Sequence, residues 1–453
     1  MKEIVREFLC YGLWGNTYII VDQATKHSKF LLTKAVNEEP EWLASCVKEA
    51  KNISPYHSML GLAYLSLAKN KELFRNTFNE TVQNIVDLYT FCVLMEELEL
   101  SSNMVKKTIN NWYVSNLEEK DASIHKMIVR DCVDFSGVKI SKKHKKARDI
   151  INEALHDEIM LERTKAVMSI NSWLSKNEYE ERCKILMRDF EVELGELHSL
   201  YKLDEDKKID LVYDYLENQC PTRAVIQVPI IINVFDGKLP VRIQEILKEK
   251  IVAYTRGPWS LLLLGNRIRI KSLQATIKKK IDSTSFLIPT DKRVGIYVNT
   301  AWSMSSPLKR HEDTSTLDMA SLIASCLFRG IEKSKIYSVG KTIKEIKTKA
   351  KNISNIQKRI KQMCVSTTGM PESICKSKGL KEDVLIYITH SQDTSNLEYL
   401  WSKERKDKNS VLVIWRIETN KELISRRENI YYIHGFGDHQ WKAMEYILTK
   451  KEG

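Results

Sequence analysis

The sequence predicts a mainly α-helical protein in two parts, a helical-repeat region over residues 1–285 and an α/β domain over residues 286–453. Three observations favour this fold class. Apolar residues at helical spacing recur from about Glu41 to Lys280. Short runs rich in Val, Ile and Tyr follow Pro289 and alternate with helical patterns. The 453 residues include 16 glycines and 9 prolines, too few for a disordered chain or a Gly-rich all-β fold.

The first part consists of successive amphipathic segments. Residues 78–93 carry apolar side chains three or four positions apart, which predicts one helix face formed by Phe78, Val82, Ile85, Tyr89 and Val93. Residues 147–159 and 168–174 repeat this pattern. A single amphipathic helix cannot bury its apolar face alone, so many in succession predict stacked helix pairs, as in a solenoid.

The second part alternates strands and helices. The expected strands are Val294–Val298, Ile336–Val339, Val384–Ile388, Val411–Trp415 and Ile430–Ile433. The expected helices are Leu317–Arg329, Ile343–Met363 and Asp438–Leu448. Buried strands separated by helices predict a parallel, doubly wound sheet, whose functional site lies at the carboxyl ends of the strands.

Composition narrows the class of partner and the compartment. Lys and Arg outnumber Asp and Glu by 71 to 59, and the net charge of +12 makes a polyanion the first partner to consider. The nine cysteines form no C-x-x-C pair, which indicates free thiols in a reducing compartment. The sequence lacks a secretory signal pattern and an apolar run long enough for a bilayer. We expect a soluble protein of the cytoplasm, with the nucleus as a second compartment and no membrane partner.

Several short motifs occur in an order known from one family. Residues 8–12 and 15–19 read FLCYG and GNTYI, residues 88–91 and 111–113 read LYTF and NWY, and residues 289–293 and 298–304 read PTDKR and VNTAWSM. This ordered set resembles the Ro ribonucleoprotein autoantigens, whose shared part is called the TROVE module. The resemblance implies a ring of HEAT-like helical repeats followed by a von Willebrand factor A domain. It also implies binding of small noncoding RNAs, called Y RNAs, and of single-stranded ends of misfolded RNAs.

The first basic segment is the main candidate for an RNA surface. It contains no acid, and its cations and one histidine are Lys139, Lys142, Lys143, His144, Lys145, Lys146 and Arg148. Closely spaced cations displace condensed counterions from phosphates together. The resemblance further implies that His144 matches an RNA-contacting histidine of the family, with Lys126 and Arg130 at the positions of its upstream cations. The alternative is a solvated basic loop.

Two further basic segments follow. Arg267, Arg269 and Lys271 precede Lys278–Lys280 without an acid, and their alternation indicates either the lining of a groove or the polar rim of a helix. Residues 341–361 carry many lysines and one acid, Glu345. Because they fall on an expected helix, a solvated helix face is the favoured interpretation of this third segment.

The resemblance also implies a divalent-cation site in the second part, built from a D-x-S-x-S loop, a threonine and an aspartate. The matching positions here are Asn299, Ala301, Ser303, Thr367 or Thr368, and His390. Mg²⁺ prefers hard oxygen ligands and carboxylate charge, and both carboxylates are replaced. We therefore expect a vestigial site, with no metal and no cofactor. Rescue by Asp393 and a transition-metal site at His390 are the alternatives.

The sequence carries no phosphate-binding loop, nucleophile elbow, H-E-x-x-H or kinase pattern, so we do not expect an enzyme. The expected function is that of a Ro-type, noncoding-RNA-binding protein, with Y RNA-like or misfolded small RNA bound to basic surfaces of the helical ring. We expect a monomer that also meets protein partners in a ribonucleoprotein. The alternative is a protein-interaction scaffold that kept the fold and lost RNA and metal binding.

Overall fold

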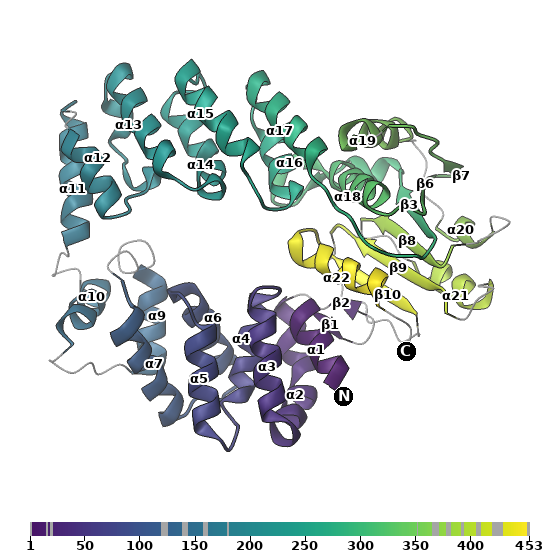
Figure 1. The fold of residues 1–453 in the computed structure, drawn as a ribbon, viewed down its shortest axis with the longest axis horizontal. Helices are drawn as coiled ribbons and strands as arrows, with labels where there is room; N and C mark the ends of the chain where they lie inside the picture. Colours follow the sequence, from purple (N-terminus) through teal and green to yellow (C-terminus); the bar gives the residue numbers. More distant parts are fainter. Residues whose placement is uncertain are drawn as a thin grey trace. The chain divides into compact units, whose positions relative to one another are not determined.

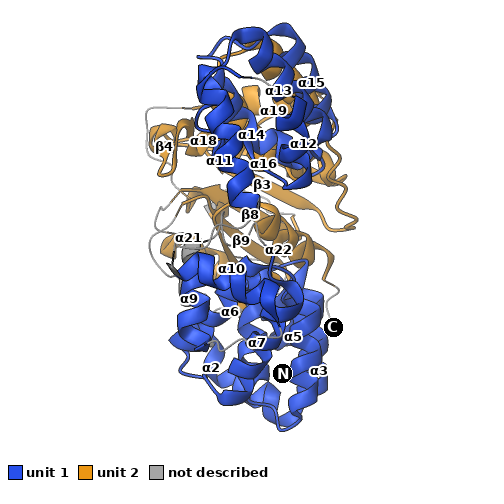
Figure 2. Ribbon diagram, turned by 90° about the vertical axis from the view of Figure 1, so that its left-hand side faces the viewer, with its two compact units in different colours: residues 1–10, 21–255 blue, residues 11–20, 256–453 orange. Residues whose placement is uncertain are grey.

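The computed structural model describes residues 2–14, 17–18, 21–118, 126–137, 144–156, 162–178, 181–350, 352–364, 371–376, 382–390, 394–404, 409–418 and 429–450. The chain forms two compact units, which Figure 2 shows in different colours. Unit 1 comprises residues 1–10 and 21–255, and unit 2 comprises residues 11–20 and 256–453. Among the described helices, none combines the length and the apolar character that a membrane crossing requires.

Unit 1 consists of helices (Figure 1). Its first helices are α1 Lys2–Tyr11, α2 Val21–Glu38, α3 Pro40–Lys51, α4 Pro55–Leu65, α5 Lys71–Thr81, α6 Ile85–Glu97, α7 Asn103–Asn116, α9 Lys126–Ser136 and α10 Lys145–His156. Its later helices are α11 Glu162–Ser175, α12 Glu181–Asp189, α13 Glu205–Asn218, α14 Pro221–Val234 and α15 Val241–Val252, with the 3-10 turns η1 Leu194–Glu196 and η2 Leu200–Lys202. Helices near in sequence pack together, as α3 does with α4, α6 with α9, and α13 with α15. The predicted stack of helices is confirmed.

The helix is interrupted where the sequence predicts one continuous helix over 78–93. Val82 has an extended backbone (φ −86°, ψ 92°) and ends α5. The side chain of Asn84 then accepts hydrogen bonds from the backbone N–H groups of Val86 and Asp87, both at 3.0 Å, and so begins α6. The predicted single helix is therefore wrong, because an asparagine cap separates two shorter helices.

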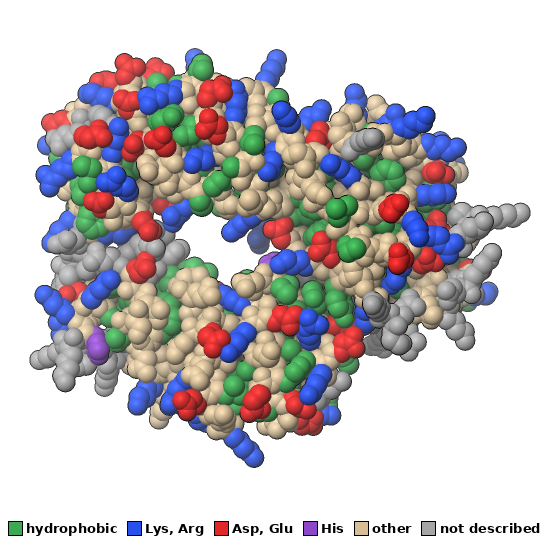
Figure 3. All heavy atoms as spheres, in the orientation of Figure 1, with side chains coloured by type: hydrophobic (Ala, Val, Ile, Leu, Met, Phe, Trp, Pro, Cys, Tyr) green, Lys and Arg blue, Asp and Glu red, His purple; other side chains and the backbone are tan. Residues whose placement is uncertain are grey.

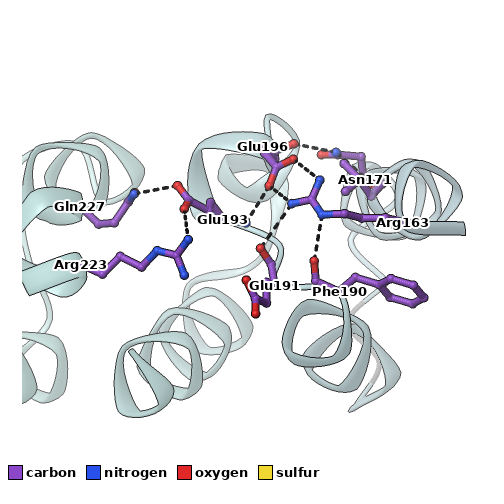
Figure 4. Close-up of polar contacts among 9 residues, drawn as sticks. Arg163, Asn171, Phe190, Glu191, Glu193, Glu196, Arg223 and Gln227 are labelled. Atoms are coloured by element: carbon purple, nitrogen blue, oxygen red, sulfur yellow. Dashed lines mark hydrogen bonds and ion pairs between the residues drawn. The ribbon is translucent and has the colours of Figure 1, made fainter. Parts of the chain in front are cut away.

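A buried ion pair holds the irregular chain that follows α12 (Figure 4). The Arg163 side chain, in α11, is only 2% exposed. Its Nη1 and Nη2 donate to the two carboxylate oxygens of Glu196 at 2.9 and 2.7 Å. Its Nε and Nη2 donate to the carbonyls of Phe190 and Glu191 at 2.9 and 3.3 Å. One guanidinium thus links α11 to the end of α12 and to η1.

Unit 2 is built around an eight-stranded sheet in the order β1-β2-β10-β9-β8-β3-β6-β7. The strands are β1 Leu13–Trp14, β2 Thr17–Tyr18, β3 Val294–Asn299, β6 Ser334–Val339, β7 Ile343–Glu345, β8 Val384–Thr389, β9 Val411–Arg416 and β10 Ile430–His434. The five strands from β10 to β6 in this order are parallel. The predicted parallel, doubly wound sheet is confirmed. The sequence pattern did not reveal β1 and β2, where Thr17 pairs with Tyr432 of β10, or the separate hairpin of β4 Pro307–Leu308 and β5 His311–Ser315.

Helices cover both faces of this sheet. The helices of unit 2 are α16 Pro258–Arg267, α17 Lys271–Ser283, α18 Thr316–Gly330, α19 Ile353–Gln362, α20 Ser373–Lys376, α21 Ser395–Glu404 and α22 Asp438–Thr449, of which α16 and α17 pack on the β4–β5 hairpin, α18 and α19. Trp401 of α21 packs with Tyr297 and Tyr387 on one face. On the other face α18 packs against β3 and β6, and also against α19. Because both faces are covered, every residue of β3, β8 and β9 is buried.

Two features of unit 2 differ from the sequence-based expectation. The helix expected over 343–363 is wrong at its start, because Lys344 pairs with Ser338 at the edge of the sheet and forms β7; α19 begins after Asn352, whose side chain accepts from the N–H of Asn355 at 3.1 Å. The units also divide at 255/256, whereas the sequence suggests 285/286. Helices α16 and α17 belong to unit 2, where Asn266 Nδ2 donates to Thr314 Oγ1 at 3.1 Å.

Candidate nucleic-acid interface

The first basic segment lies at the start of α10. His144, Lys145 and Lys146 are exposed, and the first turn of the helix carries no acid. The two lysines form no ion pair with any residue that the structure describes. Cations at a helix N-terminus are disfavoured by the helix dipole, whereas anions are favoured there. The N–H groups at a helix N-terminus and the two ammonium groups together suit a phosphate.

The two arginines predicted beside this turn make contacts within the protein. Arg130 of α9 is half-buried, and its guanidinium donates from Nε to the carbonyl of Ala154 and from Nη2 to the carbonyl of Leu155, the latter at 3.2 Å. These carbonyls belong to the last turn of α10, so Arg130 caps that helix. Arg148 is also half-buried, with its Nε 3.8 Å from Asp149 Oδ1. The sequence pattern gave no sign of the capping role of Arg130.

Four further predicted residues have side chains outside the described part of the structure. Helix α9 begins at Lys126, but the placement of that side chain is not described. The same holds for all atoms of Lys139, Lys142 and Lys143. Their assignment to RNA binding stays a prediction.

The second basic segment is the connection between α16 and α17. Arg267, Arg269 and Lys271 are exposed, while Ile268 between the first two is 3% exposed. Ile268 and Ile270 have extended backbone angles. The alternation of cations therefore comes from an extended connector with period two, and the interpretation as a helix rim is wrong for Arg269.

Helix packing brings the second and third basic segments together. Helix α17 lies against α19. Lys278 of α17 and Lys358 of α19 are both exposed and line the same groove. The sequence pattern shows two separate segments, because 60 residues lie between Lys280 and Lys341. A contact between helices this far apart in sequence leaves no local signal.

The vestigial metal loop lies at the carboxyl end of β3. Asn299 is 1% exposed, and its amide is engaged within the protein. Its Nδ2 donates to Thr389 Oγ1 at 3.0 Å, and its Oδ1 accepts from the N–H of Ala301 at 2.9 Å. Ala301 supplies no side-chain oxygen, and Ser303 lies in the 3-10 turn η3 Trp302–Ser305. Thr367, Thr368 and Asp393 lie outside the described residues.

The neighbouring strand ends carry positive charge. Arg416, at the end of β9, is 3% exposed and donates from Nη2 to Thr394 Oγ1 at 2.9 Å. Burial and then the charge of Arg416 lower the pKa of His390, and the same two causes lower the pKa of His434 to about 4. Both imidazoles are therefore neutral at pH 7.

These residues do not fit a Mg²⁺ ion. A neutral amide, a methyl group and a buried guanidinium provide neither the carboxylate charge nor the array of oxygen ligands that Mg²⁺ requires. Within the described residues, no three His, Cys, Asp or Glu side chains come together in a way that would hold a metal ion.

Comparison with known proteins adds one finding on the fold. No family model and no curated protein sequence matches this chain. Among solved structures, the chain is similar to the crystal structure of the Deinococcus radiodurans RO (RSR) protein, with a TM-score of 0.65 and 10% sequence identity. The match covers 99% of each chain. The resemblance seen in the sequence motifs is thus confirmed at the level of the fold, over the whole length of both proteins.

Proposed function

We propose that this chain is a noncoding-RNA-binding protein of the Ro ribonucleoprotein type. The observation that carries the proposal is its likeness to the Deinococcus radiodurans RO (RSR) protein over 99% of both chains. Unit 2 has the α/β fold although its metal loop does not fit Mg²⁺. We therefore assign unit 2 a role in positioning binding surfaces, without a bound metal. The proposed activity is binding, without catalysis, and the proposed compartment is the cytoplasm with the nucleus as a second one.

The surface proposed for RNA in unit 1 is the region from Lys139 to Lys146. Its described end, the first turn of α10, offers exposed lysines and has no acid in that turn. Phosphate groups suit these cations. Each phosphate neutralised by a lysine releases counterions, so binding should weaken steeply as salt is added. We expect His144 to contribute less than its lysine neighbours, because each lysine brings an ammonium charge to the phosphates.

The proposal is tested by reversing charge at Lys142, Lys143, Lys145 and Lys146 together. Affinity for a labelled structured small RNA, measured by fluorescence anisotropy over a range of KCl, should fall at least 100-fold. The slope of log K against log salt should become shallower by about 3, because each lost phosphate contact removes roughly 0.7–0.9.

A matched control carries the same change of net charge at scattered positions of unit 1, Lys29, Lys69, Lys107 and Lys238, which are all exposed. Its affinity should stay within about threefold of the wild type. Equal losses in the two variants would mean that only net charge matters and would overturn the surface. A wild-type protein without RNA affinity would favour the protein-interaction scaffold instead.

A further inference from the structure

Unit 2 contains a groove that lies between the second and third basic segments. It lies among helices α16, α17 and α19 and has a volume of about 560 Å³. This is within the range of about 300–1,000 Å³ that is usual for ligand sites. Leu262 of α16, Ile277 of α17 and Gln357 of α19 are among its lining residues. The groove thus has apolar wall segments next to polar ones.

The charge of the groove is positive. Among the described residues, no aspartate or glutamate lines it, and three lysines do. Lys361 forms an ion pair with Asp318. Lys278 of α17 and Lys358 of α19 are exposed and form no ion pair with any described residue. Figure 3 shows Lys and Arg side chains in blue over the part of unit 2 that α17 and α19 form. Two ammonium groups on facing helices can each neutralise a phosphate.

The groove also presents fixed hydrogen-bond acceptors. Gln274 Nε2 donates to the carbonyls of Ile268 and Gly265, at 2.8 and 3.3 Å. A carbonyl only accepts, so the nitrogen of this amide must face the backbone and its Oε1 remains available as an acceptor. Gln357 is fixed in the same way, because its Nε2 donates to the carbonyl of Asp318 at 3.4 Å.

Phosphate-binding cations, apolar wall segments and amide oxygens together match one class of ligand. Adenine, cytosine and guanine carry amino groups on their Watson–Crick edges, which are exposed in a single strand and paired in a duplex. We propose that this groove binds a short single-stranded segment of RNA. Lys278 and Lys358 contact its phosphates, and Gln274 and Gln357 accept hydrogen bonds from amino groups of its unpaired bases.

This inference rests on the proposed function, and its test uses the full chain. Labelled ten-nucleotide RNAs, A₁₀, C₁₀ and U₁₀, and a ten-base-pair duplex serve as probes in fluorescence anisotropy. The variant K278E/K358E should bind A₁₀ at least tenfold more weakly than the wild type. Its slope of log K against log salt should be shallower by about 1.4, twice the roughly 0.7 per phosphate of a single strand.

The control variant K335E/K403E changes the net charge equally on the opposite face of the sheet. Lys335 lies two residues before Tyr337 on β6, so both side chains point to the same face of the sheet. Tyr337 packs against the cluster of α20 and α21, and Lys403 lies on α21. Both lysines are exposed. The control should bind A₁₀ within twofold of the wild type.

A second variant, Q274A/Q357A, tests the bases. It should bind A₁₀ and C₁₀ more weakly than the wild type does, because it lacks the amide oxygens that accept from their amino groups. If the wild type binds RNA and K278E/K358E binds A₁₀ as tightly as the control variant does, the groove is not the RNA site, and the proposed function stays intact. Duplex RNA that binds as tightly as A₁₀ would overturn the single-strand assignment. A wild type that binds none of these probes and no structured small RNA would overturn both proposals.

Discussion

The buried guanidinium of Arg163 allows a stability prediction with a worked magnitude. The substitution Arg163→Met keeps most of the aliphatic stem and removes at least four hydrogen bonds, among them two to the Glu196 carboxylate and two to backbone carbonyls. Breaking a buried pair on one side typically costs about 3–5 kcal/mol. Glu196 is 22% exposed and keeps the N–H of Glu193 as a donor, at 2.9 Å. The expected loss is therefore at the lower end, about 3 kcal/mol.

Hydrogen–deuterium exchange followed by mass spectrometry measures this loss where it occurs. In peptides from α11, α12 and η1, protection from exchange through local opening should fall about 100-fold, because about 1.4 kcal/mol corresponds to a factor of ten. Arg188→Met is the matched control, since Arg188 and its partner Asp189 are 65% and 53% exposed. Such a surface pair contributes roughly 0–1 kcal/mol. Equal protection in the two variants would refute the assignment of Arg163 as the element that holds this connection.

Three further predictions concern unit 2. Burial lowers the pKa of His434 in the folded protein to about 4, so the free energy of unfolding should fall by about 3 kcal/mol as the pH falls from about 6.5 to 4. Urea unfolding of His434→Phe should lack this part of the pH dependence. A pH profile identical to that of the wild type would contradict this prediction. Gly330→Ala should lower the melting temperature, because the added Cβ would lie 1.7 Å from the carbonyl oxygen of Phe286. Gly195→Ala is the control, because its Cβ would lie at an ordinary contact distance of 3.5 Å from Ile230 Cδ1. Millimolar MgCl₂ should leave the melting temperature of the full chain as it is in EDTA. An upward shift that Ser303→Ala abolishes would contradict the vestigial-site assignment.

Hydrophobic patterning was enough to predict the two-part fold class. Strands such as β3 and β8 are buried along their whole length, so their runs of Val, Ile and Tyr stand out in the sequence. Local capping was harder to predict, as at Asn84, where one short polar side chain divides a helical pattern that is otherwise continuous. The strand pair β1 and β2 consists of two residues each, too short for a period to be seen.

The candidate site was predictable only in part. The cations could be found from the sequence, because charge without neighbouring acids is a local property. The partners of these cations could not be predicted. Arg130 contacts a carbonyl of α10 that is 25 residues away in sequence, and Lys278 lines the same groove as Lys358, 80 residues away. Such contacts depend on how helices pack, and helical periodicity does not determine which helices become neighbours.

The most direct test of RNA binding is ultraviolet crosslinking of the full protein in cells, followed by sequencing of the attached RNA and mass spectrometry of the attached peptides. The proposed function predicts a discrete set of small noncoding RNAs, with crosslinks in peptides from 139–148 or from α17 and α19. A protein of similar net charge from the same cells provides the background. Recovery of no RNA above that background would contradict the account.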